Sequence, residues 1–254
     1  MDSKHKIIIG MSMVLLVLMT NGCAAPNVAN MSIIATESKL TYWVAPDGDD
    51  SNLGTEEQPF RTVTHALDLV PKIILHPVHI WLNPGYYNED IIVDGFVCSR
   101  ALVISGTTDM GEWRVSGHPE LHRVNSVSVE HCKGMVLIQH IEAVTATKAG
   151  FSANVSGPKI EFLGVKVVTP SDKTGIRISQ GSTSYIQLSV ISNRGVAIVS
   201  ERYSNAHLRE NSGENNKVSL KAVRGALITT DGNQPAGERI TGGGGAINWE
   251  TEIE

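Results

Sequence analysis

Two kinds of short apolar segment alternate in the second half of the chain, and their spacing predicts stacked coils. Four segments open with glycine, continue with a short apolar or alternating run and end in Ser, Thr, Gly or Asn; they begin at Gly150, Gly175, Gly195 and Gly225. The intervals between these glycines fall in the range of about 20–50 residues that is typical of stacked solenoid coils. Further strand-like segments lie between them, at residues 159–164, 184–189, 205–209 and 217–221. The pattern therefore predicts about two strands per coil, as in a β-solenoid.

The first half of the chain shows the same strand periodicity. Residues 40–45 form an apolar strand that ends in a loop of turn residues, and residues 78–83 alternate with a period of two before Pro84 and Gly85. Later apolar runs continue the predicted stack, at residues 91–93, 101–105, 112–115, 127–129 and 135–138.

A helical pattern separates the first two of these strands. Thr62 is a suitable N-cap, and apolar residues fall on one face of a helix at Val63, Ala66, Leu67, Val70, Ile73 and Ile74. A proline inside a helix costs about 3 kcal/mol, so Pro71 and Pro77 predict that the regular helix ends near Val70 or in a kinked final turn. We expect this helix to cap the first coil, whose edge has no neighbouring coil. At the other end, we expect Trp249 to belong to a closing lid.

Composition adjusts this picture in two ways. Hydrophobic residues make up 41% of the 254 residues but aromatic residues only 5%, which predicts an interior of Val, Ile, Leu and Ala in one solenoid. The net charge is −5 and the basic residues are scattered, so the chain lacks the positive surface that a nucleic-acid partner requires.

The N-terminus predicts export. Lys4 and Lys6 precede an apolar run at residues 7–19, which is too short to span a bilayer. Residues 20–23 resemble the lipobox of bacterial lipoproteins, which implies acylation of Cys23, although Thr20 and Asn21 replace the usual Leu and small residue. Cleavage near Ala24 without lipid, or an uncleaved anchor, remains open. All three place the mature chain outside the cytoplasm, lipid-anchored or secreted, with residues 24–39 as a flexible tether.

Two cysteines remain after the predicted signal segment. Cys98 and Cys132 are too few for a disulfide framework or a zinc site. They are either buried small apolar residues or one long-range disulfide formed in an oxidising compartment.

Residues 42–68 carry a family resemblance. A strand, a D-G-x-D-x-N-x-G loop, the sequence P-F-x-T and a helix follow one another there, and residues 79–96 continue with an x-G-x-Y-x-E turn. The segment resembles the opening of the pectate-lyase-like right-handed parallel β-helix superfamily, and the likeness covers roughly residues 41–250. It implies an all-β right-handed parallel β-helix over residues 78–250, preceded at residues 40–77 by a strand, an acidic loop and a capping helix. Residues 85–90 and 232–237 are also similar to β-helix proteins of phage tails and prophage regions. Because this superfamily includes lyases, hydrolases, adhesins and virion parts, the resemblance fixes no activity.

The acidic loop is a candidate metal site. Asp47, Asp49, Asp50 and Asn52 offer the oxygen ligands that calcium prefers. The alternative is that these residues make turns and cap the following helix.

Candidate catalytic residues lie after the first coil turn. Glu89, Asp90 and Asp94 are close in sequence, and Arg114 follows. A lyase needs a group that neutralises the uronate and a base, and a hydrolase needs paired carboxylates. The lyase patterns R-x-P-x-x-R and W-x-D-H are absent, as are the hydrolase patterns N-T-D and G-H-G. Asp90, Asp94 and Arg114 are therefore candidates for an alternative, enzymatic function, while Glu89 is also suited to a structural hydrogen bond.

Other polar side chains give weaker indications. Six histidines at positions 76, 79, 118, 122, 131 and 140 include pairs that could meet in space, such as His131 and His140, but each is also suited to a surface position. Basic residues that could line one face toward an acidic glycan are Lys166, Arg177, Arg194, Lys221 and Arg224.

Together these features predict an exported β-helix of the cell envelope that binds carbohydrate or acts as a scaffold without catalysis. The expected cofactor is none, or calcium alone. The expected partners are a polysaccharide or cell-surface glycan and the membrane, through the lipid anchor. The alternatives are a polysaccharide lyase or glycoside hydrolase acting on an acidic glycan, and a prophage-derived tail-type structural protein. The oligomeric state stays open.

Overall fold

The computed structural model describes residues 35–106 and 119–249. The signal segment, Cys23, most of the tether, the strand expected at residues 112–115, and Arg114 lie outside the described residues. Ordered contacts begin before the predicted strand at Leu40, because Thr36 is buried and its hydroxyl accepts hydrogen bonds from the backbone N–H groups of Leu75 and His76. Among the described residues, no helix has the length and apolar character needed to cross a membrane.

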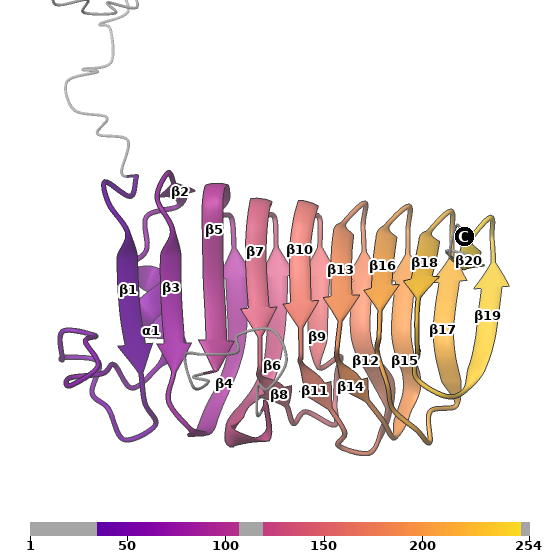
Figure 1. Ribbon diagram of the computed structural model, residues 1–254, viewed down its shortest axis with the longest axis horizontal. Helices are drawn as coiled ribbons and strands as arrows, with labels where there is room; N and C mark the ends of the chain where they lie inside the picture. Colours follow the sequence, from indigo (N-terminus) through magenta and orange to yellow (C-terminus); the bar gives the residue numbers. More distant parts are fainter. Residues whose placement is uncertain (1–34, 107–118, 250–254) are drawn as a thin grey trace, which may run out of the picture. The chain divides into compact units, whose positions relative to one another are not determined.

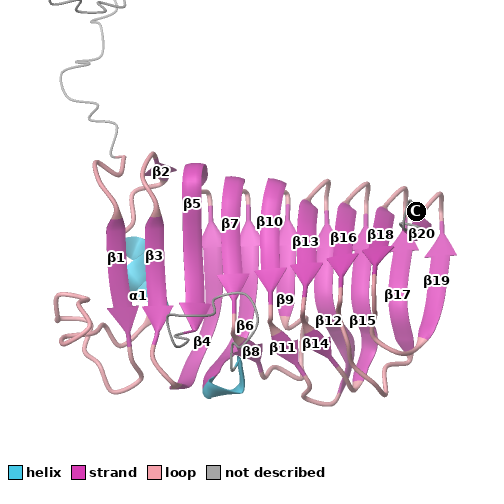
Figure 2. Cartoon of the chain, viewed as in Figure 1, coloured by secondary structure: helices cyan, strands magenta, loops and turns pink. Residues whose placement is uncertain are grey.

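Within the described residues, the strands form two ten-stranded sheets whose pairings are all parallel (Figures 1 and 2). The first sheet, in spatial order, contains β1 (Leu40–Val44), β3 (Val78–Leu82), β5 (Val97–Gly106), β7 (Lys133–Gln139), β10 (Gly157–Leu163), β13 (Thr183–Gln187), β16 (Asn205–Arg209), β18 (Leu227–Asp231) and β20 (Ala246–Trp249), with β2 (Ile73–Ile74) beside β5.

The second sheet takes the strands that alternate with these in the sequence. Its longer members are β4 (Gly85–Asp94), β6 (His122–Glu130), β9 (Phe151–Asn154), β12 (Ser171–Ser179), β15 (Arg194–Glu201), β17 (Val218–Val223) and β19 (Glu238–Gly242). A chain that alternates between two parallel sheets must wind as a coil, so the predicted parallel β-helix is confirmed.

A column of two-residue strands departs from the predicted two strands per coil. It consists of β8 (Glu142–Ala143), β11 (Lys166–Val167) and β14 (Val190–Ile191), which continue from the first half of β6. Strands this short cannot show a period in the sequence, which is why this third segment of the coil was not predicted.

The coils shorten toward the C-terminus. Successive partners in one inward column of the first sheet are Val136, Ile160, Ser184, Ala206, Ile228 and Ile247. The sequence separation between neighbours in this column falls from its first pair to its last, so later coils contain fewer residues. The coil that leads from Tyr42 to its partner Ile80 is longer than any of these, because helix α1 lies within it.

The four glycine segments do not share one structural position. Three of these glycines belong to the second sheet: Gly150 directly precedes β9, Gly175 lies in the middle of β12 and Gly195 is the second residue of β15. Gly225 instead precedes β18 of the first sheet. A Cβ atom on Gly225 would come within 2.6 Å of the Tyr203 ring, so this glycine makes room for an aromatic side chain. The prediction that the Gly225 segment is equivalent to the other three segments is therefore wrong.

The interior is aliphatic, as the composition predicts, and its corners are lined with small polar side chains. The Ser156 hydroxyl accepts from the Cys132 N–H at 3.1 Å, and the Ser182 hydroxyl accepts from the Ser156 N–H at 3.0 Å. These contacts satisfy buried backbone groups where the chain turns between sheets. Cys98 and Cys132 are free buried thiols, and burial raises the pKa of Cys98 to about 12.

Helix α1 (Val63–Asp68) begins at the predicted N-cap, where the Thr62 hydroxyl accepts from the His65 N–H at 3.1 Å. It buries Val63, Ala66 and Leu67 and lies against β1, β3 and β4. The helix ends just before the predicted Val70, because the Val70 N–H bonds to the Leu67 carbonyl in a tighter turn ahead of Pro71. The expectation that Ile73 and Ile74 extend the helical face is wrong, because these two residues form strand β2 beside β5.

Candidate functional site

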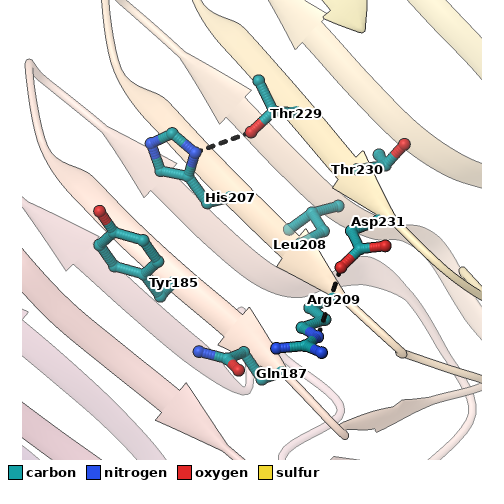
Figure 3. Close-up of a pocket in the computed structure, with 8 residues that line it drawn as sticks. All are labelled: Tyr185, Gln187, His207, Leu208, Arg209, Thr229, Thr230 and Asp231. Atoms are coloured by element: carbon teal, nitrogen blue, oxygen red, sulfur yellow. Dashed lines mark hydrogen bonds and ion pairs between the residues drawn. The ribbon is translucent and has the colours of Figure 1, made fainter. Parts of the chain in front are cut away.

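The outer face of the first sheet carries a groove formed by three consecutive coils (Figure 3). Two outward rows cross β13, β16 and β18: Tyr185, His207 and Thr229 are register partners, as are Gln187, Arg209 and Asp231. We call this cavity of about 270 Å³ the ring groove; its lining residues are Tyr185, Gln187, His207, Leu208, Arg209, Thr229, Thr230 and Asp231. Its volume lies near the lower end, about 300 Å³, of typical small-molecule sites.

Two aromatic rings form one wall of the ring groove. Tyr185 and His207 stack with their centroids 4.9 Å apart and their planes 19° from parallel. Neighbouring strands lie about 4.8 Å apart, so register partners on one face are placed for such stacking. Thr229 Oγ1 lies 2.7 Å from His207 Nδ1 and holds the imidazole in this orientation. The two partly exposed rings are therefore held in a fixed aromatic stack.

An ion pair forms the opposite wall. Arg209 Nε lies 3.3 Å from Asp231 Oδ2, and the two side chains are 66% and 46% exposed. Gln187 completes the row, and its amide nitrogen donates to Glu161 on β10 at 3.2 Å. Figure 3 shows the amide and the ion pair beside the ring stack. The ring groove thus combines an aromatic surface with hydrogen-bond donors and acceptors.

Two of the three carboxylates of the predicted calcium loop, Asp49 and Asp50, accept hydrogen bonds from within the protein. Asp49 Oδ1 accepts from the N–H and hydroxyl of Ser51, and these hydrogen bonds lower the pKa of Asp49. Asp50 accepts from the N–H groups of Arg61 and Thr62 and from the Thr62 hydroxyl. Burial by itself raises the pKa of Asp50, but these hydrogen bonds hold it below its ordinary value. The contacts are those of the alternative interpretation, a loop that turns and supports the helix start.

Glu89 also supports helix α1. Its two carboxylate oxygens accept from the N–H groups of Val63 at 2.9 Å and Thr64 at 3.0 Å, and one accepts from the Thr64 hydroxyl at 2.7 Å. Together with Thr62, Glu89 satisfies the first three N–H groups of the helix. The structural interpretation of this glutamate is therefore correct.

Asp90 lies on the outer face of the second sheet. Its Oδ1 is 2.8 Å from Lys148 Nζ and accepts from the Ser126 hydroxyl at 2.6 Å. The hydrogen bonds from Lys148 and Ser126 lower the pKa of Asp90. Asp90 lines a second cavity of about 300 Å³ together with Lys148, Glu130 and Arg177, and Arg177 pairs with Glu201.

Asp94 takes part in a different cluster. Its Oδ1 lies 2.8 Å from His131 Nδ1, and the ligand atoms of Asp94, Glu130 and His131 all fall within 4.8 Å of one another. Among the described residues, this group has the spacing to hold a metal ion, whereas the predicted loop of Asp47, Asp49 and Asp50 does not form such a group. Asp90 and Asp94 therefore have separate partners, and the third catalytic candidate, Arg114, lies outside the described residues.

Arg194 does not belong to the predicted basic face, because it is only 1% exposed and lies in the interior. Its guanidinium donates to four backbone carbonyls, and Lys166 instead lies 3.7 Å from Glu120. His131 and His140 occupy turns at opposite ends of β7, so they do not form the pair suggested by the sequence.

The ring groove residues were not predicted as a site. Tyr185 and His207 occupy equivalent outward positions in two of the predicted strand segments, one coil apart. An aromatic side chain that recurs at the same position in successive strands is a sequence feature that can indicate this site. Thr229 and Asp231 could not be recognised in the same way, because the Gly225 segment was predicted to be equivalent to the three earlier glycine segments, which lie in the other sheet.

Comparisons with known proteins give a family and distant structural similarity. The sequence model of the family described as "Protein of unknown function (DUF1565)" matches residues 46–243. No curated protein matches the chain.

Solved structures of the GH136 lacto-N-biosidase from Eubacterium ramulus, native and selenomethionine forms, are similar with TM-scores of 0.39 and 0.41, 11% identity, and coverage of 76% and 75% of this chain. A rhamnogalacturonan lyase is similar with a TM-score of 0.41, 14% identity and coverage of 83% of this chain. The matches cover 55–62% of the length of those proteins.

Proposed function

The chain belongs to the DUF1565 family, whose description gives no activity, and we propose from the chain's own geometry that it binds carbohydrate without cleaving it. The binding site in this proposal is the ring groove on the outer face of the first sheet. The main observation that supports this proposal is the stack of Tyr185 on His207 beside the Arg209–Asp231 pair.

This combination matches the chemistry of a sugar ring. A pyranose has an apolar face of C–H groups, which can lie on a flat aromatic surface, and a rim of hydroxyls that both donate and accept hydrogen bonds. In the ring groove, Arg209 is a donor, Asp231 an acceptor and Gln187 both. Because strand pairing fixes the backbone of all three residues, little backbone conformational entropy is lost on binding.

The carboxylate content of the ring groove favours binding over hydrolysis. Glycosidases generally use two carboxyl groups about 5–10 Å apart on either side of the scissile bond. The lining of the ring groove contains one carboxylate, Asp231, and that carboxylate is paired with Arg209.

Cleavage of an acidic glycan is the second candidate function, favoured by the cavity beside Asp90. There Lys148 and Arg177 supply the positive charge that a lyase uses to neutralise a uronate. Lys148 is paired with Asp90, and Arg177 with Glu201, so both cations are already neutralised. This is why we place binding in the ring groove first.

The remaining parts of the proposal concern winding, capping and location. We infer right-handed winding because parallel crossovers are right-handed in about 98% of cases, and we assign helix α1 the role of capping the first coil. The chain is exported and held at the membrane by acylated Cys23. Mass spectrometry of the native N-terminus tests this directly, since an unprocessed N-terminus would contradict both export cleavage and acylation.

The binding proposal is tested with the full-length mature protein and a panel of neutral and acidic oligosaccharides. Isothermal titration calorimetry should detect binding that Tyr185→Ala weakens about tenfold, equivalent to ~1.4 kcal/mol. Tyr203→Ala is the matched control, because Tyr203 is 78% exposed and lies outside the ring groove. Mass spectrometry of each mixture should show intact glycan. Unsaturated or reducing-end products, or equal binding by the two variants, would overturn the proposal.

A further inference from the structure

We infer that the ring groove selects uncharged sugars and rejects uronic acids, an inference that rests on the proposed function of this groove. The placement of charged side chains in the groove supports this inference. Arg209 is the one cationic side chain among the residues that line the ring groove, and Asp231 is the one anionic side chain. Their formal charges cancel, and the two groups lie 3.3 Å apart.

The pairing determines what Arg209 can recognise. An arginine free of partners binds a carboxylate through two parallel hydrogen bonds, which would favour an acidic sugar. In this groove the Nε–H of Arg209 faces Asp231, so a uronate would have to displace Asp231 or lie beside it. Either arrangement leaves two like charges close together, which costs affinity.

A second carboxylate adds to this effect. Glu161 lies next to the ring groove on β10, where one of its oxygens accepts from the Gln187 amide at 3.2 Å. Glu161 is the register partner of Tyr185, so the ring groove has a carboxylate at each end, Glu161 on β10 and Asp231 on β18. A neutral sugar avoids this repulsion, because its hydroxyls can donate to Asp231 and accept from Arg209 and Gln187.

The ion pair acts on selectivity more than on stability. Both side chains are exposed, and such surface pairs contribute only about 0–1 kcal/mol to folding. Asp231→Asn should therefore leave the protein folded while removing the anion and releasing Arg209. The substitution keeps the size of the side chain, so it changes charge with little change in the shape of the groove.

The experiment measures Kd by calorimetry for matched tetrasaccharides of glucose and glucuronic acid, and of galactose and galacturonic acid, with the same linkage in each pair. The wild-type protein should prefer the neutral member at least tenfold, with little dependence on salt. Asp231→Asn should reduce that preference at least tenfold or invert it at low salt. Asp172→Asn is the control, since Asp172 is an exposed carboxylate that pairs with Lys173 outside the groove.

The outcomes separate the two proposals. Absence of binding to every sugar would overturn the proposed function, and the selectivity with it. Binding with equal or greater affinity for uronic acids, or an unchanged preference in Asp231→Asn, would overturn the selectivity and leave carbohydrate binding intact.

Discussion

The guanidinium of Arg194 donates a hydrogen bond to the carbonyl oxygen of Thr145, two coils earlier in the stack, over 3.0 Å. The same group donates to the carbonyls of Thr169, Lys148 and Thr174 at 2.8, 2.9 and 3.1 Å. One buried side chain at the start of β15 therefore ties together segments of two earlier coils, and desolvation lowers the pKa of Arg194.

We expect Arg194→Met to lower the free energy of unfolding by about 3 kcal/mol or more, because it leaves four carbonyls without their donor and each buried unpaired group costs about 1–3 kcal/mol. Urea denaturation measures the loss. Arg100→Met, at an exposed position on β5, should change stability by less than about 0.5 kcal/mol. Equal effects of the two substitutions would show that the four hydrogen bonds contribute nothing.

Val155 should be a position where a substitution stabilises the protein. Its φ of 48° lies in the left-handed region, which is strained for a β-branched residue, and its side chain is 47% exposed. Asn tolerates this conformation, so Val155→Asn should raise stability by about 1 kcal/mol and raise Tm. Val97→Asn is the control, with 48% exposure but a place in strand β5, where Val is preferred. A fall in Tm for Val155→Asn would contradict the prediction.

Arg194 and the ring groove show which parts of the structure the sequence does not predict. Period-two alternation predicted most longer strands, because every second residue enters an aliphatic interior. A charged residue in such a strand is expected to point toward solvent. The sequence does not indicate that the Arg194 side chain points inward and donates to backbone carbonyls of earlier coils. The ring groove as a whole could not be predicted from the sequence for a similar reason. Its two rows come from strands of successive coils, and only the register between coils brings Tyr185 beside His207.

Glu89 should stabilise helix α1 although it follows the helix in the sequence and reaches back to its first residue, Val63. Glu89→Gln removes the charge and leaves one acceptor oxygen for the N–H groups of Val63 and Thr64. We expect stability to fall by about 1–2 kcal/mol, the size of a lost N-cap. Urea denaturation measures the loss, and amide hydrogen exchange at Val63 and Thr64 should accelerate. Glu57→Gln, at an exposed position in the preceding loop, should have no effect, and similar losses in both variants would rule out the capping role.

The opening loop should hold its conformation without calcium. Asp49 and Asp50 already accept N–H and O–H donors from residues 51, 61 and 62, so an ion would compete for the same oxygens. We expect the same Tm in millimolar calcium and in EGTA, whereas Asp50→Asn should lower Tm in both conditions. A calcium-dependent rise in Tm that Asp50→Asn abolishes would instead establish the loop as a calcium site.

The pair formed by Asp90 and Lys148 should make stability depend on pH in a defined direction. The Lys148 hydrogen bond, followed by that of Ser126, lowers the pKa of Asp90 below the ordinary value near 4. A lowered folded pKa means that the contribution to stability is present above the unfolded value and is lost as pH falls through the folded value. Lys148→Met should therefore raise the pKa of Asp90 toward its ordinary value. The stability difference from wild type should be largest at neutral pH and shrink below about pH 4. Carboxyl NMR titration and urea denaturation at both pH values test this, with Lys133→Met, an exposed lysine on β7, as the control. A Lys148→Met variant with an unchanged Asp90 titration would show that the contact does not stabilise the charged carboxylate.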